Sequence, residues 1–451
     1  MHHQSSCSVK SDRVKGFEGT TSKATLLLPS DYYAISVKVQ KTVFNYQSVL
    51  VFLDISFVIV SILLGVPITV LFIECLSALF PGKSETGKKE VQINRQKIAV
   101  LVPAHNESSG IGATIETLKP QLTERDRIIV IADNCTDETA TIARELGATA
   151  IERKDTSLRG KGYALDYGLK FIAQKPPEVV VIVDADCIVE EGAIAKLAQL
   201  AGKSGKPVQA NYLMEKPPQP KPKDLVSALA VTVKNVVRPS GLTKLGLPCV
   251  LGGTGMAFPW SAIGEVSLAS GNLVEDMQLT VDLAIAGHPT LFCHDAKVTG
   301  RLPQQQEAAK QQRTRWEHGH LKTSFTQVPR LLKASFAQRR FDLLALALDF
   351  CVLPLSLLVM IWIAATAMAF VAGWWGITSI ALVLLLMEGF LLLSSIVASW
   401  VKFGRADLPL LTLLSVPFYI LWKIPLYLGF LIKPQTQWIR TQRDITETQD
   451  S

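Results

Sequence analysis

Two aspartates stand one residue apart at the end of a short apolar run, in the stretch "VVVIVDADC" of residues 179–187. Asp184 and Asp186 repel each other when both are ionised in a closed cleft, so leaving them unpaired there costs free energy. A divalent cation removes this cost, because Mg²⁺ binds one or two carboxylates together with phosphate oxygens and water. The pair therefore predicts a metal site that also holds a diphosphate. A single D-x-D pattern recurs by chance, so its neighbours decide the interpretation.

Further along the chain, two more groups of residues could take part in chemistry. Glu275 and Asp276 open a helical stretch, where carboxylates are either a charged first turn or, for Asp276, a general base. Gln312 and Arg315 lie at i and i+3 on one helix face, with Trp316 beside them. Arginine suits a diphosphate and tryptophan offers a flat face to a sugar ring. The alternative is an amphipathic helix on the membrane surface, and both interpretations can hold together.

These residues must be positioned by the segment from residue 96 to 336, where short β-branched runs alternate with longer helical ones. This alternation predicts a mostly parallel α/β sheet, in which ligands bind at the carboxyl ends of the strands. Glu107 follows the first predicted strand, Asp133 the second, and Asp184 with Asp186 a later one. Aspartate and asparagine also favour turns, so for any one of these positions the alternative is a plain turn residue.

Four long apolar runs flank this segment, at about residues 50–79, 344–370, 377–400 and 408–432. Each is long enough for the roughly 20 residues of a bilayer crossing. We predict a polar tail over 1–46, a transmembrane helix over 47–81, about three transmembrane or interfacial helices over 343–432, and a tail over 433–451. More lysine and arginine follows the first run than precedes it, which predicts an inner or plasma membrane protein with a cytoplasmic central domain.

Composition excludes several classes of function. The seven cysteines show no C-x-x-C or Cys/His spacing, so neither structural disulfides nor a zinc site is expected. The net charge of +7 lies on flanks of the apolar runs, which suits anionic lipid and not nucleic acid. A transporter is expected to have paired polar residues within its spans or repeated halves, and this chain shows no repeat. A non-catalytic subunit is expected to have lost the D-x-D pair or the base, and this chain retains both. The glycines of "GGTG" lack the setting of a dinucleotide site.

Seven short motifs occur in a fixed order between the two apolar regions: "VPAHNE", "ADNCTD", "RGKGYALDYGL", "DAD", "GGTGMAF", "VEDMQLT" and "QRTRW". In this order and spacing, residues 96–335 resemble the membrane-embedded family 2 glycosyltransferases, a group that includes cellulose, hyaluronan and poly-N-acetylglucosamine synthases. The resemblance implies a GT-A type nucleotide-diphospho-sugar transferase domain, with a Rossmann-like sheet, inserted between transmembrane helices. It also implies a UDP-sugar donor.

The resemblance assigns the donor site residue by residue. The loop after the first strand would hold the uridine through Pro103, Ala104 and Glu107. Asp133, in the second acidic loop, would contact the base, and Lys161 of the Gly-Lys-Gly segment would lie near the diphosphate.

For the reaction itself, the resemblance places Mg²⁺ or Mn²⁺ on Asp184 and Asp186 and the base on Asp276, in a motif that includes Glu275. Arg315 would lie near the diphosphate. A single base without a second carboxylate nucleophile implies one in-line displacement with inversion, so an α-linked donor yields a β-linked product.

The acceptor is less determined. In the Q-x-x-R-W motif, Gln312 belongs to the substrate site and Trp316 would lie beneath the acceptor sugar. The segment "PCVL" before "GGTG" differs from the Phe-Phe-Cys-Gly motif of cellulose synthases. A growing β-linked exopolysaccharide is expected, with other polysaccharide-export proteins as possible partners. Single transfer to a lipid or lipid-linked acceptor is the alternative. We interpret His318 and His320 as polar residues of an interfacial helix, not as catalysts or ligands.

Overall fold

The computed structural model describes residues 29–81, 95–217, 219–264, 266–301 and 306–432. The chain divides into two compact units, 1–55 and 56–451, and every element below lies in the second except the first part of α1. Helix α1 (Pro29–Leu79) starts earlier than the predicted residue 47. The prediction that residues 29–46 belong to a polar tail before the helix is therefore wrong. Proline suits the first position of a helix because its missing N–H would be unsatisfied there anyway. The predicted tails over 1–28 and 433–451 lie outside the described residues.

An eight-stranded sheet forms the centre of the α/β domain, in the order β3-β2-β1-β4-β7-β6-β8-β5. Strands β3, β2, β1 and β4 run parallel, whereas β7 is antiparallel to both β4 and β6. Strand β8 pairs parallel with β6 and antiparallel with β5. The strands are β1 (Ile98–Ala104), β2 (Arg127–Asp133), β3 (Thr149–Arg153), β4 (Val179–Ile182), β5 (Cys187–Val189), β6 (Val208–Glu215), β7 (Met256–Pro259) and β8 (Leu291–Arg301).

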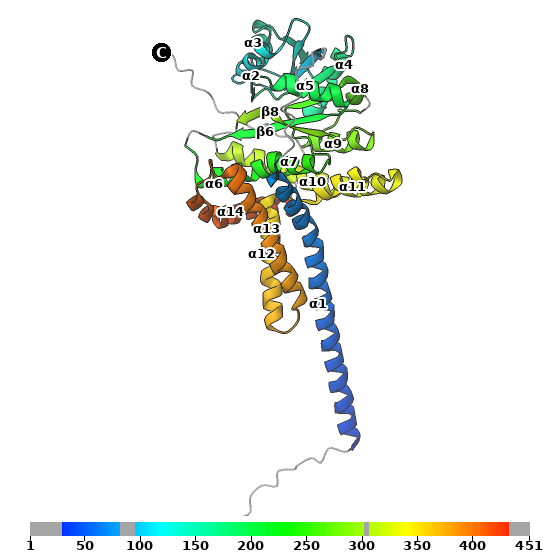
Figure 1. The fold of residues 1–451 in the computed structure, drawn as a ribbon. Coiled ribbons are helices and arrows are strands. Elements are labelled where there is room, and N and C mark those ends of the chain that lie inside the picture. The colour runs from blue at the N-terminus through cyan, green and yellow to red at the C-terminus, as the bar shows by residue number, and fades with distance from the viewer. Residues whose placement is uncertain (1–28, 82–94, 218, 265, 302–305, 433–451) are drawn as a thin grey trace, which may run out of the picture. The chain divides into compact units, whose positions relative to one another are not determined.

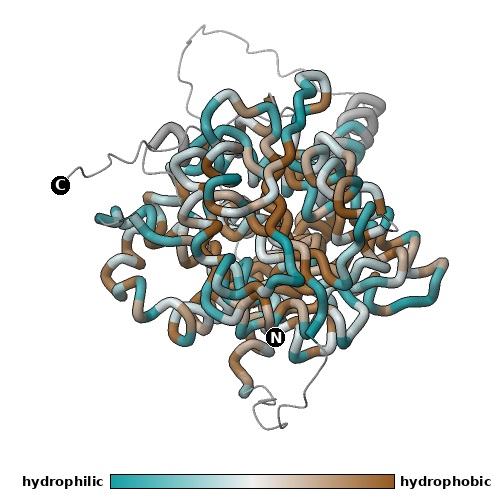
Figure 2. Tube along the Cα trace, turned by 90° about the horizontal axis from the view of Figure 1, so that it is seen from above, coloured by the Kyte–Doolittle hydropathy of each residue, from teal (hydrophilic) through white to brown (hydrophobic). Residues whose placement is uncertain are grey.

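Helices cover both faces of the sheet because successive side chains of a strand point to opposite faces. On β1, Val100 packs with α2 (Ile111–Leu118), α3 (Thr139–Glu145) and α5 (Ala193–Ser204). Its neighbour Leu101 packs on the other face with α4 (Lys161–Ile172), α8 (Trp260–Ile263) and α9 (Glu275–Ile285). A short helix η1 (Lys119–Gln121) follows α2. Strands buried on both faces read as continuous apolar runs, and Figure 2 shows such brown segments towards the middle of the view.

A second layer of helices lies against the sheet domain (Figure 1). It consists of α6 (Pro222–Thr232), η2 (Val233–Val237), α7 (Arg238–Lys244), α10 (Gln306–Gln338), α11 (Phe341–Cys351) and α14 (Val416–Ile432). Leu229 of α6, with Val233 and Val237 of η2, packs against Leu64, Ile68 and other apolar residues of the membrane-type helices. The same helical segment therefore faces the apolar helices on one side and the sheet domain on the other.

Four helical stretches of the described chain are long and apolar enough to cross a membrane: Gln47–Leu79, Leu355–Trp374, Ile380–Gly404 and Leu410–Ile432. They comprise α1, α12 (Leu355–Trp374), α13 (Ile380–Ser399) with η3 (Trp400–Gly404), and η4 (Leu410–Ser415) with α14. Large apolar side chains such as Phe370, Trp374 and Phe390 are exposed, as lipid-facing residues would be. The four runs expected from the sequence therefore correspond to helices of suitable length.

One predicted run has a different internal structure. The apolar run over 344–370 is divided into α11 and α12 at residues 352–354. Pro354 precedes α12 and disfavours helical backbone at the residue before it. Leu343, Leu346 and Phe350 of α11 are fully buried against α9 and α10. Helix α11 is thus part of the layer beneath the sheet, and only α12 has the character of a span.

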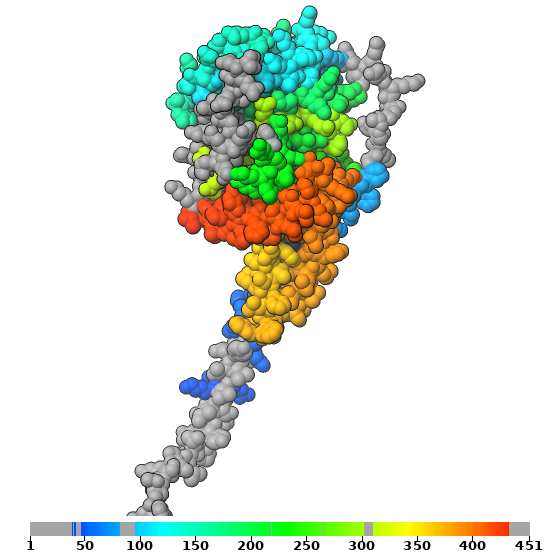
Figure 3. All heavy atoms as spheres, turned by 90° about the vertical axis from the view of Figure 1, so that its left-hand side faces the viewer, coloured from blue at the N-terminus to red at the C-terminus, as the bar shows by residue number. Residues whose placement is uncertain are grey.

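Helix α14 differs in its surroundings from α12 and α13. Figures 1 and 3 show it crosswise to them, at the base of the α/β domain. Its Lys423 is buried and forms an ion pair with Glu317 of α10, and the backbone oxygen of Leu426 lies 2.9 Å from His318 Nε2. These polar contacts favour the interfacial alternative for the last apolar run.

Candidate active site

A cavity of about 560 Å³ opens at the carboxyl ends of β1, β2 and β4, between the sheet and the layer of α6, η2 and α10. Every site residue predicted from the sequence lines it: Pro103, Ala104, Glu107, Asp133, Lys161, Asp184, Asp186, Glu275, Asp276, Gln312, Arg315 and Trp316. These residues come from six separate segments of the chain. Their convergence agrees with the rule that ligands of α/β sheets bind beyond the strand ends.

The loops after β1 and β2 form one end of the cavity. The backbone N–H of Thr136 donates to Asn106 Oδ1 over 2.7 Å, and Asn106 Nδ2 donates to Thr136 Oγ1 over 3.2 Å. Asn134 links the second loop to the third in the same way, since the Asp155 N–H donates to its Oδ1 over 2.8 Å. Asn106 and Asn134 have φ of 53° and 52°, a conformation that asparagine tolerates. These contacts hold the loops at this end of the cavity together.

Asp133 is held by an arginine at the same end of the cavity. Arg153 Nη1 lies 2.7 Å from Asp133 Oδ1, and both side chains are about nine-tenths buried. Burial raises the pKa of Asp133, and the hydrogen bond and charge of Arg153 oppose that rise without cancelling it. Part of the hydrogen-bonding capacity of Asp133 is therefore used within the protein.

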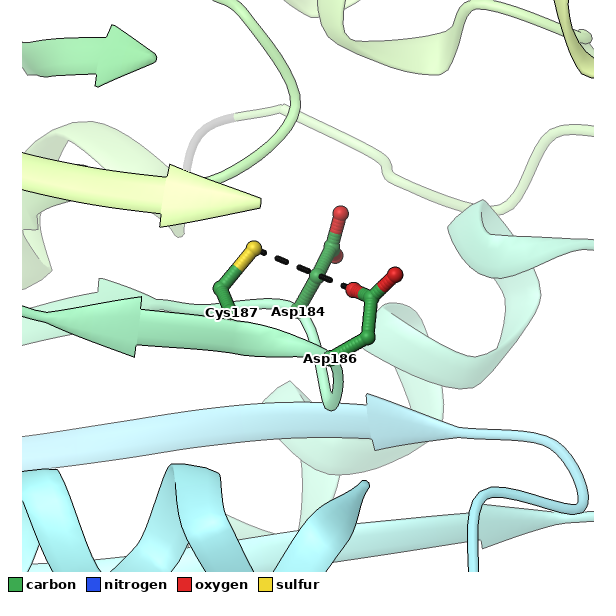
Figure 4. Close-up of side chains that lie close together, drawn as sticks. All are labelled: Asp184, Asp186 and Cys187. Atoms are coloured by element: carbon green, nitrogen blue, oxygen red, sulfur yellow. Dashed lines mark hydrogen bonds between the residues drawn. The ribbon is translucent and has the colours of Figure 1, made fainter. Parts of the chain in front are cut away.

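Asp184 and Asp186 lie at the end of β4, with Cys187 at the start of β5 (Figure 4). One ligand atom from each of these three residues lies within 4.8 Å of the others. Cys187 Sγ is 3.8 Å from Asp186 Oδ1, and Thr254 Oγ1 lies 3.6 Å from the same sulfur. Burial and the nearby aspartates raise the pKa of the Cys187 thiol well above its usual range. The carboxylates are thus the anionic ligands that this cluster offers to a hard cation.

Lys161 is the cation that faces this acidic cluster. It begins α4, forms an ion pair with Asp184, lies 3.7 Å from Glu275 Oε1 and donates to the backbone oxygen of Gly253 over 2.6 Å. Burial lowers the pKa of Lys161, but the charges of Asp184, Glu275 and Asp276 outweigh it, so the pKa is raised overall. Lys161 therefore remains protonated at neutral pH.

Glu275 and Asp276 form the first turn of α9, as predicted. The backbone N–H of Met277 donates to Asp276 Oδ1 over 2.9 Å, which orients the carboxylate at the positive end of the helix. A Cβ at Gly253 would lie 3.3 Å from Asp276 Oδ2, and the φ of Gly253 is 88°, so glycine suits this position. Burial raises the pKa of Glu275 to about 7, against the opposing charge of Lys161.

Helix α10 closes the cavity with Gln312, Arg315 and Trp316. Within the described chain, the buried Gln312 Oε1 has no hydrogen-bond partner. Arg313 points to the other side, where its Nη2 lies 3.6 Å from Asp224 Oδ1 of α6. The helix therefore presents the predicted motif to the cavity while Arg313 holds it against α6.

Sequence reasoning missed other residues of the cavity wall. Lys234 and Asn235 belong to η2, a π-helical turn between α6 and α7, and Tyr212 and Arg301 come from β6 and β8. A signal was present, because a lysine and an asparagine interrupt the apolar stretch "SALAVTVKNVV". π-Helical turns are rare and frequently occur at functional sites.

The two histidines after Trp316 do not line this cavity. His318 contacts the backbone of α14, as described above. His320 is buried and lines a neighbouring cavity of about 40 Å³, shared with Lys234, Arg238 and Asp349. Burial, and then the charges of Lys234 and Arg238, lower the pKa of His320 to about 3. Both histidines therefore lie outside the cavity that the predicted site residues line.

Residues 95–319 match the model of a protein family described as "Glycosyltransferase like family 2". The match starts just before β1 and ends within α10, so it includes all the predicted site residues. The sheet, with its parallel half and its mixed half, is a GT-A-like α/β fold. This part of the chain is a family 2 glycosyltransferase domain.

Individual relatives match shorter segments. The 4,4'-diaponeurosporenoate glycosyltransferase of Staphylococcus aureus is 29% identical over 136 residues, which are 29% of this chain and 36% of that protein. An uncharacterised protein of Methanocaldococcus jannaschii is 36% identical over 95 residues, 21% of this chain and 37% of that protein. The chain thus spans little more than a third of the length of these curated relatives.

The solved structures that match this chain have lower sequence identity. A mannosyltransferase of Pyrobaculum calidifontis in complex with GDP-Man and Mn²⁺ is 20% identical, with a TM-score of 0.49, covering 82% of this chain and 99% of that chain. Glucosyl-3-phosphoglycerate synthase of Mycobacterium tuberculosis, with Mn²⁺ and UDP, is 22% identical, with a TM-score of 0.34, covering 50% and 80%. At these values the similarities identify neither the donor nor the acceptor of this chain.

Proposed function

We propose that this protein is an inverting, metal-dependent membrane glycosyltransferase that moves a sugar from a UDP-sugar to a growing β-linked polysaccharide. The observation that carries the proposal is the convergence of the predicted donor, metal, base and acceptor residues on one cavity. Chance D-x-D or E-D patterns would not be expected to meet in this way. The catalytic domain would lie in the cytoplasm, as the positive charge beside the apolar runs indicates.

The donor would lie with its uridine over Pro103 and Ala104, beside Glu107 and Asp133. Its diphosphate would extend towards Lys161, which is held at the start of α4. Fixing both ends of the donor supports transfer because the anomeric carbon is then presented to the acceptor in one orientation.

The acidic cluster fits a hard divalent cation such as Mg²⁺ or Mn²⁺. Asp184 and Asp186 offer carboxylate oxygens at the carboxyl end of β4. The ion pair of Asp184 with the Lys161 ammonium supports the view that this position favours a positive charge. When bound, a divalent cation stabilises negative charge on the departing diphosphate. The buried thiol of Cys187 is a poor partner for such a cation.

Asp276 would take the proton from the acceptor hydroxyl as its oxygen attacks the anomeric carbon. The Met277 N–H holds the Asp276 carboxylate in place, and the glycine at 253 leaves room beside it. Arg315, fixed on α10, would neutralise charge on the leaving UDP. One displacement without a covalent intermediate inverts the configuration, so an α-linked donor gives a β-linked product.

A growing polymer is the acceptor that the Q-x-x-R-W helix supports best. Trp316 lines the cavity on the side of the membrane-type helices and would stack beneath the terminal sugar. The family 2 match and the flanking apolar helices support synthesis at a membrane, where other polysaccharide-export proteins could receive the product.

Single transfer to a lipid or lipid-linked acceptor is the second candidate. Three observations favour it. The described chain has four candidate spans, few for a polymer channel, and polar contacts bind the last of them, α14, to α10. The name of the Staphylococcus aureus relative also indicates a glycosyltransferase that acts on 4,4'-diaponeurosporenoate.

A donor screen followed by product sizing tests both candidates. The full chain in nanodiscs would be incubated with radiolabelled UDP-glucose, UDP-N-acetylglucosamine or UDP-galactose, and with GDP-mannose, with and without Mn²⁺. Metal-dependent incorporation from a UDP-sugar supports the proposal, and high-molecular-weight product separates polymer synthesis from single addition. Absence of cation-assisted UDP binding would reject the assignment of the donor site.

A further inference from the structure

Lys234 is a cation without a carboxylate partner on the wall of the cavity. It forms no hydrogen bond or ion pair within the described part of the chain, and its exposed side chain lines the cavity. Two other cations of the same wall are paired with carboxylates: Lys161 with Asp184, and Arg301, whose Nε lies 3.3 Å from Glu215 Oε2. An unpaired cation in such a place is available to a ligand.

The position of Lys234 relates it to the proposed base. Lys234 and Asp276 both line this cavity, as does Lys161. Desolvation lowers the pKa of Lys234, and the Asp276 carboxylate opposes this fall without cancelling it. Lys161 belongs to the metal side of the cavity, since it is bound to Asp184. Lys234 comes instead from the helical segment beside the membrane-type helices. The two lysines therefore line the cavity from different elements.

The element that carries Lys234 is held in place. Val233 and Val237 of η2 are buried in the apolar cluster with α1, and Arg238, at the start of α7, is paired with Glu74. The π-helical turn between these anchors shifts the side-chain register, so that Lys234 and Asn235 line the cavity. A fixed backbone makes a charged group selective, because little order is lost when a ligand binds.

Resting on the proposed function, we propose that Lys234, with the amide of the adjacent Asn235, binds an anionic group carried by the acceptor, either a carboxylate or a phosphate. The unpartnered Oε1 of Gln312, which is buried in the wall of the same cavity, would accept a hydrogen bond from an acceptor hydroxyl. The acceptor would thus be an acidic sugar chain or a lipid phosphate, and not a neutral glycan.

The acceptor is favoured over the donor for two reasons. The donor diphosphate already has the acidic metal site, Lys161 and Arg315 on its side of the cavity. The group beside a general base must face the hydroxyl that is deprotonated, and that hydroxyl belongs to the acceptor. A neutral acceptor would cover the Lys234 ammonium without compensating its charge, so the enzyme would discriminate against it.

Matched acceptor pairs test this assignment. The full chain in phosphatidylcholine nanodiscs, with Mn²⁺ and the active UDP-sugar, would be given octyl glucoside against octyl glucuronide, and farnesol against farnesyl phosphate. We expect kcat/KM to favour the anionic member of one pair by about tenfold or more, as hydrogen bonds to charged groups do. The pair that shows the preference distinguishes a carboxylate from a phosphate.

Three variants complete the test. Lys234→Gln should lose the preference through a higher acceptor KM while its UDP affinity with Mn²⁺ stays unchanged, and Lys234→Arg should keep it. Lys223→Gln, on α6 outside the cavity, is the control. Equal use of anionic and neutral acceptors by the wild type, or weaker UDP binding by Lys234→Gln, overturns the assignment. If the wild type shows no Mn²⁺-assisted UDP binding, the proposed function itself fails.

Discussion

Arg238 Nε lies 2.6 Å from Glu74 Oε2, and the same guanidinium group is bound to the carboxylate of Asp349. The three charged residues are buried and come from α7, α1 and α11. Because α7 continues directly from η2, this cluster ties the first apolar helix to the wall of the active-site cavity. A charge network that joins elements so far apart in the sequence fixes where the membrane-type helices meet the catalytic domain.

Replacing the central cation should destabilise the protein strongly. Arg238→Met would leave the Glu74 and Asp349 carboxylates buried without their partner, and breaking a buried pair from one side typically costs about 3–5 kcal/mol. We expect a clear fall in the midpoint of chemical unfolding in detergent. Arg330→Met is the control, since its pair with Asp282 is half exposed and worth at most about 1 kcal/mol. Equal midpoints for the two variants would show that the cluster does not hold the helices.

Metal binding should depend on both aspartates after β4. Asp184→Ala and Asp186→Ala are each expected to remove the part of UDP affinity that Mn²⁺ adds, by about tenfold or more, because each supplies an anionic ligand. Isothermal titration with UDP, with Mn²⁺ or with a chelator, measures this. Asp166→Ala, whose side chain pairs with Lys170 on α4, should behave as wild type. Retained Mn²⁺ dependence in both site variants would place the metal elsewhere.

Much of the site could be predicted because its residues follow local rules. The strand ends that carry Ala104, Asp133 and Asp184 are set by short apolar runs and their exit loops, and parallel strands bring such ends together. The start of α9 at Glu275 likewise follows from a carboxylate-rich first turn. Once a parallel sheet is assumed, these residues can be predicted to lie together even though they are far apart in the sequence.

Other features depend on contacts that local patterns do not encode. Glu74 and Asp349 stand out in the sequence as acids in apolar runs, but their partner Arg238 lies 164 and 111 positions away. Lys234 looks like a surface residue of an apolar helix until the π-helical turn directs it to the cavity. The division between α11 and α12 was missed because a single proline separates two apolar segments that follow each other directly in the sequence.

Asp276→Asn should retain nucleotide binding and lose transfer. The amide keeps the shape of the side chain but cannot accept the acceptor proton, and a positioned general base contributes about 10²–10⁴-fold to the rate. We expect kcat to fall in that range, with the Kd for UDP and Mn²⁺ within about twofold of wild type, as judged by initial rates and titration. Asp282→Asn, on the same helix but outside the cavity, is the matched control. Wild-type turnover in Asp276→Asn would exclude this residue as the base.

The buried His320 should make stability depend on pH in a defined window. Its pKa is about 3 in the folded protein, against 6.5 as the ordinary value, because burial and then Lys234 and Arg238 disfavour the charged form. The unfolded chain binds this proton below about pH 6.5 and the folded chain does not. The contribution to stability is therefore complete above pH 6.5 and is lost as the pH falls towards 3, by about 1.4 kcal/mol per pH unit.

Substitution isolates this contribution from the other titrating groups. Between pH 7.5 and 5, the unfolding midpoint of wild type should fall more steeply than that of His320→Gln. The raised pKa of Glu275 acts in the opposite direction, but both proteins retain Glu275, so its effect cancels in the comparison. His294→Gln, which replaces an exposed histidine of β8, should follow the wild-type curve. Parallel curves for wild type and His320→Gln would mean that the folded protein accommodates the charged imidazolium of His320. Asp349, which lines the same small cavity, would then have to compensate the charges of Lys234 and Arg238.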